Sequence, residues 1–193
     1  MDLSSQLKNR KSLLKPTKTV VTNFLGEKFE LQGDNSVKKI GEGFSFVVDN
    51  KPDLQVAPVA PGVFLSSQDP VAQKEILEKY KIKHILSLGI MPNVKFDGIS
   101  YHFIEILDVP EFHIDEPLQE CLGIIGECKN DNILVHCNAG VSRSATVVVA
   151  WIMSEERLSF EESLERVRSV RPCVRPNDGF VKKLKLLEKK LIE

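Results

Sequence analysis

Residues 133–153 of the 193-residue chain read ILVHCNAGVSRSATVVVAWIM, and this segment is the most informative part of the sequence. It opens with an apolar, β-branched run, Ile133 to Val135, which is typical of a buried strand. From Ala145 to Met153 the residues are apolar enough for a buried helix. The sequence therefore predicts a strand that leads into a tight loop, which leads into a helix.

The loop between this strand and this helix has the features of an anion site. It consists of Asn138, Ala139, Gly140, Val141 and Ser142. Backbone amides in such a loop, together with the N-terminus of the helix, form a nest of partial positive charge that suits a phosphate. Gly140 supplies the backbone freedom that the turn needs. We therefore predict that the loop binds a phosphate group.

Reactive side chains flank the loop. The field of the amides and of the helix N-terminus stabilises Cys137 as a thiolate, which makes it the candidate nucleophile. The planar guanidinium of Arg143 can hold two phosphate oxygens and neutralise charge in the transition state, which a lysine cannot do in a bidentate manner. His136 is expected to fix the loop through hydrogen bonds, and a buried core histidine is the alternative interpretation. The hydroxyl of Ser144 can hydrogen-bond the thiolate and help it to leave.

Hydrolysis of a phosphate ester also needs a proton donor, because expulsion of an alkoxide or phenoxide is slow without one. Asp108 is the candidate, since it follows a strand-like alternation and lies 29 residues before Cys137. Pro110 is expected to stiffen the loop that follows. Glu111 and Asp115 are the alternatives, although both are also typical of solvated loop charges.

The motif H-C-x5-R, followed by a serine, resembles the signature of the cysteine-dependent protein tyrosine phosphatases. Segments 60–69, 104–108 and 171–180 are similar to the small atypical dual-specificity phosphatases, and the likeness covers roughly residues 54–187. Asn177 resembles the family asparagine that ties the phosphate loop to the segment after the penultimate helix. A turn and helix-cap role is its alternative.

This resemblance implies a protein tyrosine phosphatase-like α/β fold, with a central, mostly parallel sheet flanked by helices. It implies hydrolysis of phosphotyrosine and of phosphoserine or phosphothreonine through a cysteinyl-phosphate intermediate, with neither a metal nor an organic cofactor. Phosphorylated proteins are the implied partners, with members of mitogen-activated kinase pathways among them. The neutral side chains of the loop favour a protein phosphatase over a lipid or RNA phosphatase. The alternative function is a kinase-pathway scaffold or a phosphopeptide-binding module with weak hydrolysis.

The composition agrees with one catalytic domain. A hydrophobic content of 42 % can fill one good-sized core, and a net charge of −1 gives no argument for binding to nucleic acid or to membranes. No apolar stretch is long enough to span a bilayer, and the N-terminus is too polar for a signal peptide. Because a thiolate enzyme needs a reducing compartment, the expected location is the cytoplasm or the nucleus.

Residues 1–53 are predicted to form an extension that is helical near Leu3 to Leu14 and otherwise poorly ordered, whereas residues 54–193 form the catalytic domain. Periodicity in that domain predicts strands at 63–65, 82–88, 101–107 and 133–135. It also predicts helices that begin near Asp69, near Ala145 and at the capping box of Ser159 and Glu162. Leu118, Leu122 and Ile125 mark a further helix, and Phe180, Leu184, Leu187 and Leu191 form the stripe of a last helix.

Metal binding is not expected from the sequence. The four cysteines, at positions 121, 128, 137 and 173, show no metal-ligand spacing. Cys121 and Cys128 are seven residues apart and are expected to share the buried face of a helix. His84 and His102 lie in strand-like contexts and are expected to be ordinary half-buried residues that form no ligand cluster.

Overall fold

The computed structural model describes residues 19–22, 27–31, 37–42 and 52–192. The chain divides into two compact units, residues 1–51 and 52–193. The second unit begins two residues before Leu54, the predicted start of the catalytic domain. Asp53, which the prediction assigned to the extension, accepts a hydrogen bond from Arg171 of the second unit.

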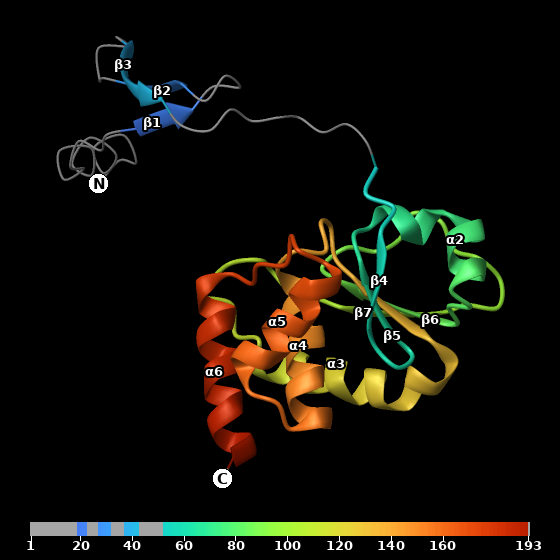
Figure 1. Cartoon of the computed structure of the whole chain (residues 1–193). Coiled ribbons are helices and arrows are strands. Elements are labelled where there is room, and N and C mark those ends of the chain that lie inside the picture. Colours follow the sequence, from blue (N-terminus) through green and yellow to red (C-terminus); the bar gives the residue numbers. More distant parts are fainter. Residues whose placement is uncertain (1–18, 23–26, 32–36, 43–51, 193) are drawn as a thin grey trace, which may run out of the picture. The chain divides into compact units, whose positions relative to one another are not determined.

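A five-stranded sheet forms the centre of the second unit (Figure 1). Its strands are β4 (Val56–Ala60), β5 (Val63–Ser66), β6 (His84–Leu88), β7 (Ser100–Ile104) and β8 (Ile133–His136). Their order across the sheet is β4-β5-β8-β6-β7. β4 pairs antiparallel with β5, and the other three pairings are parallel. The expected mostly parallel sheet is confirmed.

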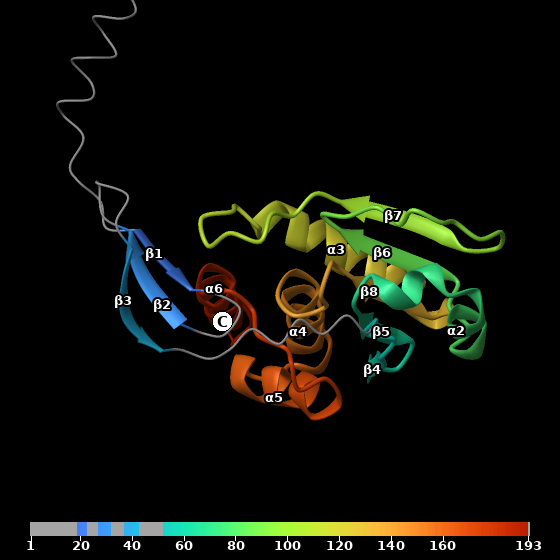
Figure 2. The same ribbon diagram turned by 90° about the horizontal axis from the view of Figure 1, so that it is seen from above.

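Helices flank this sheet. They are the 3-10 helices η1 (Asp69–Ala72) and η2 (Lys129–Asp131) and the α-helices α2 (Lys74–Lys79), α3 (Asp115–Cys128), α4 (Arg143–Glu156), α5 (Phe160–Val170) and α6 (Asp178–Ile192). α4 packs against α3, α5 and α6 (Figure 2). No helix in the described part of the chain is long and apolar enough to cross a membrane.

The inner strands β5, β8 and β6 are largely buried on both faces, as expected for a largely parallel sheet, whereas the edge strand β7 is mostly solvent-accessible. Alternate side chains of β6 and β8 enter two different hydrophobic clusters, since successive residues of a strand point to opposite faces. Leu86 and Val135 belong to the large cluster that includes α4, whereas Ile85 and Leu134 pack with Leu77 of α2. The all-round burial of α4 follows from its place inside the large cluster.

The parallel strands place their carboxyl ends at one edge of the sheet, which is where ligands bind in open α/β folds. Cys137 follows β8 directly, Gly89 follows β6 directly, and Asp108 lies four residues after the end of β7. Segments that are far apart in the sequence therefore meet at this edge.

The predicted helices and strands of the second unit are present, with different ends. The strand expected over 82–88 begins at His84, and the strand expected over 101–107 ends at Ile104. The segment from Asp69 is a 3-10 helix followed by a short α-helix rather than one continuous helix. The capping box of Ser159 and Glu162 opens α5 as predicted. β4 was not predicted, and its Pro58 is tolerated because β4 is an edge strand.

The first unit differs from its prediction. Its described residues form an antiparallel sheet of β1 (Thr19–Thr22), β2 (Glu27–Leu31) and β3 (Val37–Glu42), where the sequence led us to expect little regular structure. Backbone pairing holds these short strands, and Glu30 lies directly opposite Lys38, a favourable pairing of charges. The helix predicted near Leu3 to Leu14 lies outside the described residues.

Candidate active site

The loop from Asn138 to Ser142 has its carbonyl groups fixed on its outer side. Four successive carbonyls accept hydrogen bonds from groups outside the loop: Asn138 O from Gln68 N at 3.0 Å, Ala139 O and Gly140 O from the Arg171 guanidinium at 2.9 Å each, and Val141 O from Arg175 N at 2.8 Å. In a trans peptide the N–H points away from the C=O of the preceding residue. The N–H groups of residues 139–142 are therefore directed to the inner side, where they can bind an anion.

Gly140 is required where the loop passes β5. Its φ is +65°, a left-handed conformation that glycine adopts without strain. A Cβ at this position would lie 2.5 Å from Ser66 O and 2.8 Å from Nη2 of Arg171. Any larger residue would push the loop away from both groups, so the predicted role of Gly140 has a steric as well as a conformational basis.

Cys137 lies at the base of the loop. Its side chain is buried, with 1 % of its surface exposed, and its Sγ lies 3.1 Å from Oγ of Ser144 in the first turn of α4. The N-terminus of α4 adds its partial positive charge at the same place. The Ser144 hydroxyl can donate to a Cys137 thiolate, as the sequence suggested.

Arg143 is held at the edge of the loop. Its Nη1 donates to Leu88 O at 3.2 Å and its Nη2 to Asn138 Oδ1 at 2.9 Å. Its buried Nε has no hydrogen-bond partner among the described residues, and it lies 3.7 Å from Oδ2 of Asp108, beyond hydrogen-bond range. The guanidinium is therefore fixed at two points and keeps an N–H available for a phosphate oxygen.

Asp108 is joined to the phosphate loop by two hydrogen bonds. Its Oδ1 accepts from Ser142 Oγ at 2.7 Å and from Asn177 Nδ2 at 2.9 Å. The Ser142 hydroxyl also accepts from the Asn177 backbone N–H at 3.1 Å. Asn177 in addition caps α6, because its Oδ1 accepts from Phe180 N at 3.0 Å. Both interpretations of Asn177 therefore describe contacts that it makes.

The alternative acids lie elsewhere. Asp115, the first residue of α3, pairs with Lys183 of α6, and this hydrogen bond lowers the pKa of the Asp115 carboxyl. Glu111 is exposed to solvent. Of the three candidates, Asp108 is the one that the fold joins to the loop of Cys137.

Gly179 allows α6 to approach the loop that carries Asp108. A Cβ on Gly179 would lie 2.0 Å from Pro110 O. Only glycine permits this contact between the first turn of α6 and the Asp108 loop. Close packing thus explains why residue 179, within the segment 171–180, is a glycine.

His136 is buried behind the loop. One ring nitrogen, Nε2, lies 2.8 Å from Ser87 Oγ, and the other, Nδ1, lies 3.4 Å from Cys137 O. A carbonyl only accepts, so Nδ1 carries the proton and Nε2 accepts from the Ser87 hydroxyl. Burial lowers the pKa of His136 to about 4. The side chain is therefore neutral at neutral pH, and its burial and its two contacts fit both the supporting role and the alternative of a buried core histidine.

Arg171 is the functional residue that sequence reasoning missed. Its side chain has no exposed surface, and besides the two loop carbonyls it binds Gln55 Oε1 at 3.3 Å and the Asp53 carboxylate. One guanidinium thus connects the phosphate loop to the start of the second unit. Nothing in the sequence around Arg171 distinguishes a buried arginine from a surface one.

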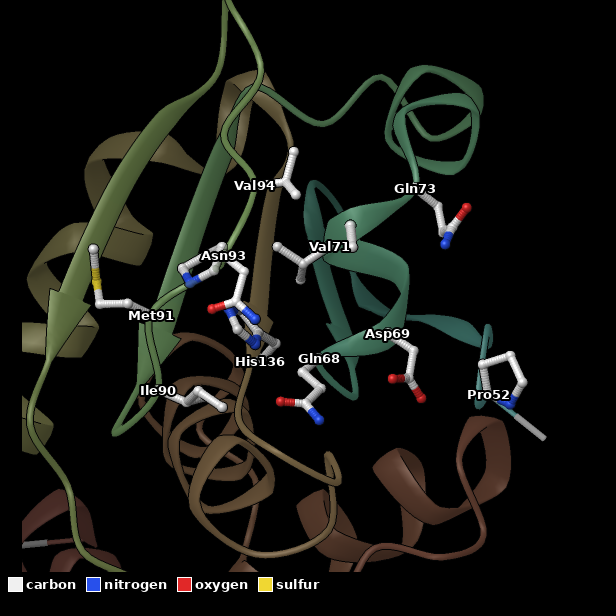
Figure 3. A pocket seen from close by; sticks show the side chains of 12 residues that line it. Pro52, Gln68, Asp69, Val71, Gln73, Ile90, Met91, Asn93, Val94 and His136 are labelled. Atoms are coloured by element: carbon white, nitrogen blue, oxygen red, sulfur yellow. The ribbon is translucent and has the colours of Figure 1, made fainter. Parts of the chain in front are cut away.

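A pocket of about 270 Å³ lies beside the phosphate loop, and His136 is part of its lining (Figure 3). Gln68, Asp69 and Val71 face residues 90–94 across this pocket. Because Gln68 N also binds the loop carbonyl of Asn138, the pocket adjoins the outer wall of the loop.

One group of side chains could hold a metal ion. Atoms of His84, His102 and Cys128 lie within 4.8 Å of one another, although the sequence predicted no ligand cluster. Both histidines are half-buried as expected, and Cys121 and Cys128 lie on the buried face of α3 as expected.

A buried cysteine within a loop of inward amides, with an arginine at the edge and an aspartate joined to the loop, defines the class of cysteine-dependent phosphatases. Residues 63–190 match the family described as "Dual specificity phosphatase, catalytic domain". The chain belongs to this family and is a cysteine-based protein phosphatase.

Individual relatives agree with this assignment. The chain is 38 % identical over 177 residues to dual specificity protein phosphatase 19 of Mus musculus, which covers 86 % of this chain and 80 % of the relative. The crystal structure of DUSP15 superposes with a TM-score of 0.65 at 32 % identity, covering 71 % of this chain and 94 % of that one. The structure of a human tyrosine phosphatase-like serine/threonine/tyrosine-interacting protein superposes with a TM-score of 0.66 at 28 % identity, covering 72 % and 98 %.

Proposed function

We propose that this phosphatase acts in two displacements at the loop of residues 137–143. In the first, Sγ of Cys137 attacks phosphorus and forms a sulfur–phosphorus bond, while the bond to the leaving oxygen breaks. The inward amides and Arg143 hold the non-reacting oxygens and offset their charge. Asp108 gives its proton to the departing side-chain oxygen.

In the second displacement, water attacks the phosphorus of the phosphocysteine. Asp108, now a carboxylate, accepts a proton from that water, and inorganic phosphate is released. The Cys137 thiolate is the leaving group, and the Ser144 hydroxyl, at 3.1 Å, stabilises it by donating a hydrogen bond.

The observation that carries this proposal is the outward direction of four successive loop carbonyls. Their partners lie on two separate segments, one at Gln68 and one that contains Arg171 and Arg175, so the direction does not depend on the loop alone. The amides are thereby oriented before any phosphate arrives. Donors that are already oriented need no reorganisation during the reaction, which is the basis of electrostatic catalysis.

We further propose phosphorylated members of mitogen-activated kinase pathways as substrates. The family resemblance supports this, and the surface around Asp108 supports a protein segment as the substrate. Leu107 and Val109, on either side of Asp108, are 53 % and 44 % exposed. Apolar side chains next to the acid suit a phosphorylated residue in a protein segment with apolar neighbours.

We propose the cytoplasm or the nucleus as the location. The reaction requires a reduced thiol at Cys137, and the cysteines at 121, 128, 137 and 173 are all free. Free thiols persist in a reducing compartment.

A second candidate function is binding of phosphoproteins with weak hydrolysis. It is supported by the shared fold with the human tyrosine phosphatase-like interacting protein. In that case the loop would bind a phosphate and release it unchanged.

Hydrolysis of a small aryl phosphate and of phosphotyrosyl and phosphothreonyl peptides distinguishes the two candidates. We expect turnover to be lost in Cys137→Ser and lowered about 100-fold in Asp108→Asn on the peptides. Asp115→Asn is the matched control and should keep full turnover. If well-folded wild-type protein turns over no faster than Cys137→Ser, the binding module is the correct function.

A further inference from the structure

Three potential metal ligands, His84, His102 and Cys128, meet at a place remote from the phosphate loop; we call them the His/Cys cluster. His84 is the first residue of β6, His102 is the central residue of β7, and Cys128 is the last residue of α3. Since β6 runs parallel to β8, His84 lies toward the end of the sheet opposite Cys137. The cluster is not part of the proposed reaction.

The distances fit a tetrahedral zinc ion. His102 Nε2 lies 3.4 Å from His84 Nδ1 and 3.9 Å from Cys128 Sγ, and all three atoms lie within 4.8 Å of one another. With Zn–N of about 2.1 Å and Zn–S of about 2.3 Å, tetrahedral ligands are separated by about 3.4 Å for two nitrogens and about 3.6 Å for nitrogen and sulfur. Two of the three separations lie within about 0.3 Å of these values, and the third, between His84 Nδ1 and Cys128 Sγ, is no more than 4.8 Å, so these two side chains move closer together to bind the ion.

Hydrogen bonds alone explain the cluster poorly. His102 Nε2 faces both the nitrogen of His84 and the sulfur of Cys128, and both separations are at the long end of the hydrogen-bond range. A neutral imidazole offers one donor, so Nε2 of His102 can donate to only one of these neighbours. A metal ion would satisfy all three atoms at once.

The surrounding charges favour a cation. The carboxylates of Glu127 and Asp131, one and three residues from Cys128 in the sequence, act electrostatically on its sulfur. The same carboxylates that oppose a bare thiolate attract a divalent ion.

We propose that His84 Nδ1, His102 Nε2 and Cys128 Sγ bind one Zn²⁺, with a fourth position left for water. Imidazole and thiolate are the ligands that zinc prefers in proteins. Binding forms the sulfur–zinc bond and releases the thiol proton of Cys128 to solvent. Because the ligands come from β6, β7 and α3, the ion links three elements of the fold and stabilises it. The half-buried histidines leave the site accessible from solvent.

The test uses the full chain with Cys137→Ser and Cys173→Ser, so that the catalytic and exposed thiols do not bind metal. The remaining thiols are then Cys121 and Cys128. Titration with Co²⁺ should give a sulfur-to-cobalt charge-transfer band that saturates at one ion per chain, and Zn²⁺ should displace it. Zn²⁺ should also raise the Tm of this protein. Absence of the band overturns the proposal.

Matched variants locate the site. Cys128→Ala should abolish the band and the rise in Tm, and His102→Gln should weaken zinc binding about 100-fold. Cys121→Ala, seven residues earlier on the same buried face of α3, should retain both signals. Retention of the band in Cys128→Ala contradicts the proposal. If that variant does not fold without metal, as judged by circular dichroism, His102→Gln decides, because unchanged binding there contradicts it equally.

Discussion

Arg171 donates its Nε–H to the carbonyl oxygen of Gly140 at 2.9 Å, from a side chain that has no exposed surface. A buried guanidinium is costly unless its charge and its donors are satisfied. Here the Asp53 carboxylate supplies the charge, and the loop carbonyls supply acceptors. Arg143 thus supplies positive charge where the phosphate binds. Arg171 is a second arginine, which lies behind the loop and orients the loop amides.

Arg171→Lys tests this role, because a lysine keeps the charge but cannot reach Ala139 O, Gly140 O and Asp53 with one planar group. We expect the affinity for inorganic phosphate to fall about 10- to 100-fold, with a similar loss in kcat/KM. Binding is measured by calorimetry on folded protein.

Arg175→Lys is the matched control, since Arg175 contacts the loop through its backbone N–H and its side chain is exposed. Equal phosphate affinity in wild type and Arg171→Lys would show that Arg171 contributes only to folding.

Gly140→Ala should disrupt the site. Both Gly140 and Gly98 have a positive φ, +65° and +78°, which costs about 1–2 kcal/mol for a residue with a Cβ. A Cβ on Gly98 meets nothing within 4 Å, whereas one on Gly140 meets Ser66 O at 2.5 Å. Urea unfolding and turnover should therefore show a larger loss for Gly140→Ala than for Gly98→Ala. Equal losses in the two variants would exclude the steric explanation.

Ser144→Ala should slow the second displacement and spare the first. A hydrogen bond to a charged group contributes about 1.5–3 kcal/mol, which corresponds to about 10- to 100-fold in the rate at which the thiolate leaves. With a good aryl leaving group, pre-steady-state kinetics should show a burst of phenol followed by slow turnover. Ser154→Ala, in the same helix, is the control. Loss of the burst itself would place Ser144 in the first displacement instead.

His136 should make the fold sensitive to acid. Burial lowers its pKa from 6.5 to about 4. Between these two values the unfolded chain binds a proton that the folded chain does not, so stability falls as the pH falls through this window. Between pH 7 and pH 5 the loss from this residue is about 2 kcal/mol.

His136→Gln removes this titration and keeps a polar side chain. Urea titrations at pH 7 and pH 5 give the free energy of unfolding of each protein. From pH 7 to pH 5 this free energy should decrease by about 2 kcal/mol less in His136→Gln than in wild type. The same decrease in both proteins would mean that His136 titrates alike in the folded and unfolded chains.

Local patterns sufficed for most of the second unit. The apolar run before Cys137, the capping box at Ser159 and the stripe of the last helix were predicted because each depends on residues close in sequence. β4 was not predicted because a proline such as Pro58 argues against a strand, except in a strand at the edge of a sheet. The strands of the first unit are short and carry charges of both signs, so they show no clear hydrophobic periodicity from which to predict them.

The site was predictable as far as its residues share a loop. The nucleophile, the arginine and the amides lie within seven residues, and Asp108 was chosen for its spacing from Cys137. Asn177, distant in the sequence, was identified through the family resemblance, whereas the other long-range contacts gave no such signal. Arg171 binds the loop from 31 residues away, and the His/Cys cluster joins positions that are 18 and 26 residues apart. Such groupings depend on the order of the strands and on the packing of the helices, and neither can be predicted from a short stretch of sequence.

Trapping the phosphocysteine intermediate tests whether Cys137 is the nucleophile of a two-step reaction. Ser144→Ala protein is mixed with an aryl phosphate, quenched during turnover and examined by tandem mass spectrometry, with Cys137→Ser treated in parallel. The mechanism predicts up to one phosphate per chain, located on Cys137, and none in Cys137→Ser. Steady turnover with no phosphate on Cys137, or with phosphate on another residue, would contradict the proposed reaction.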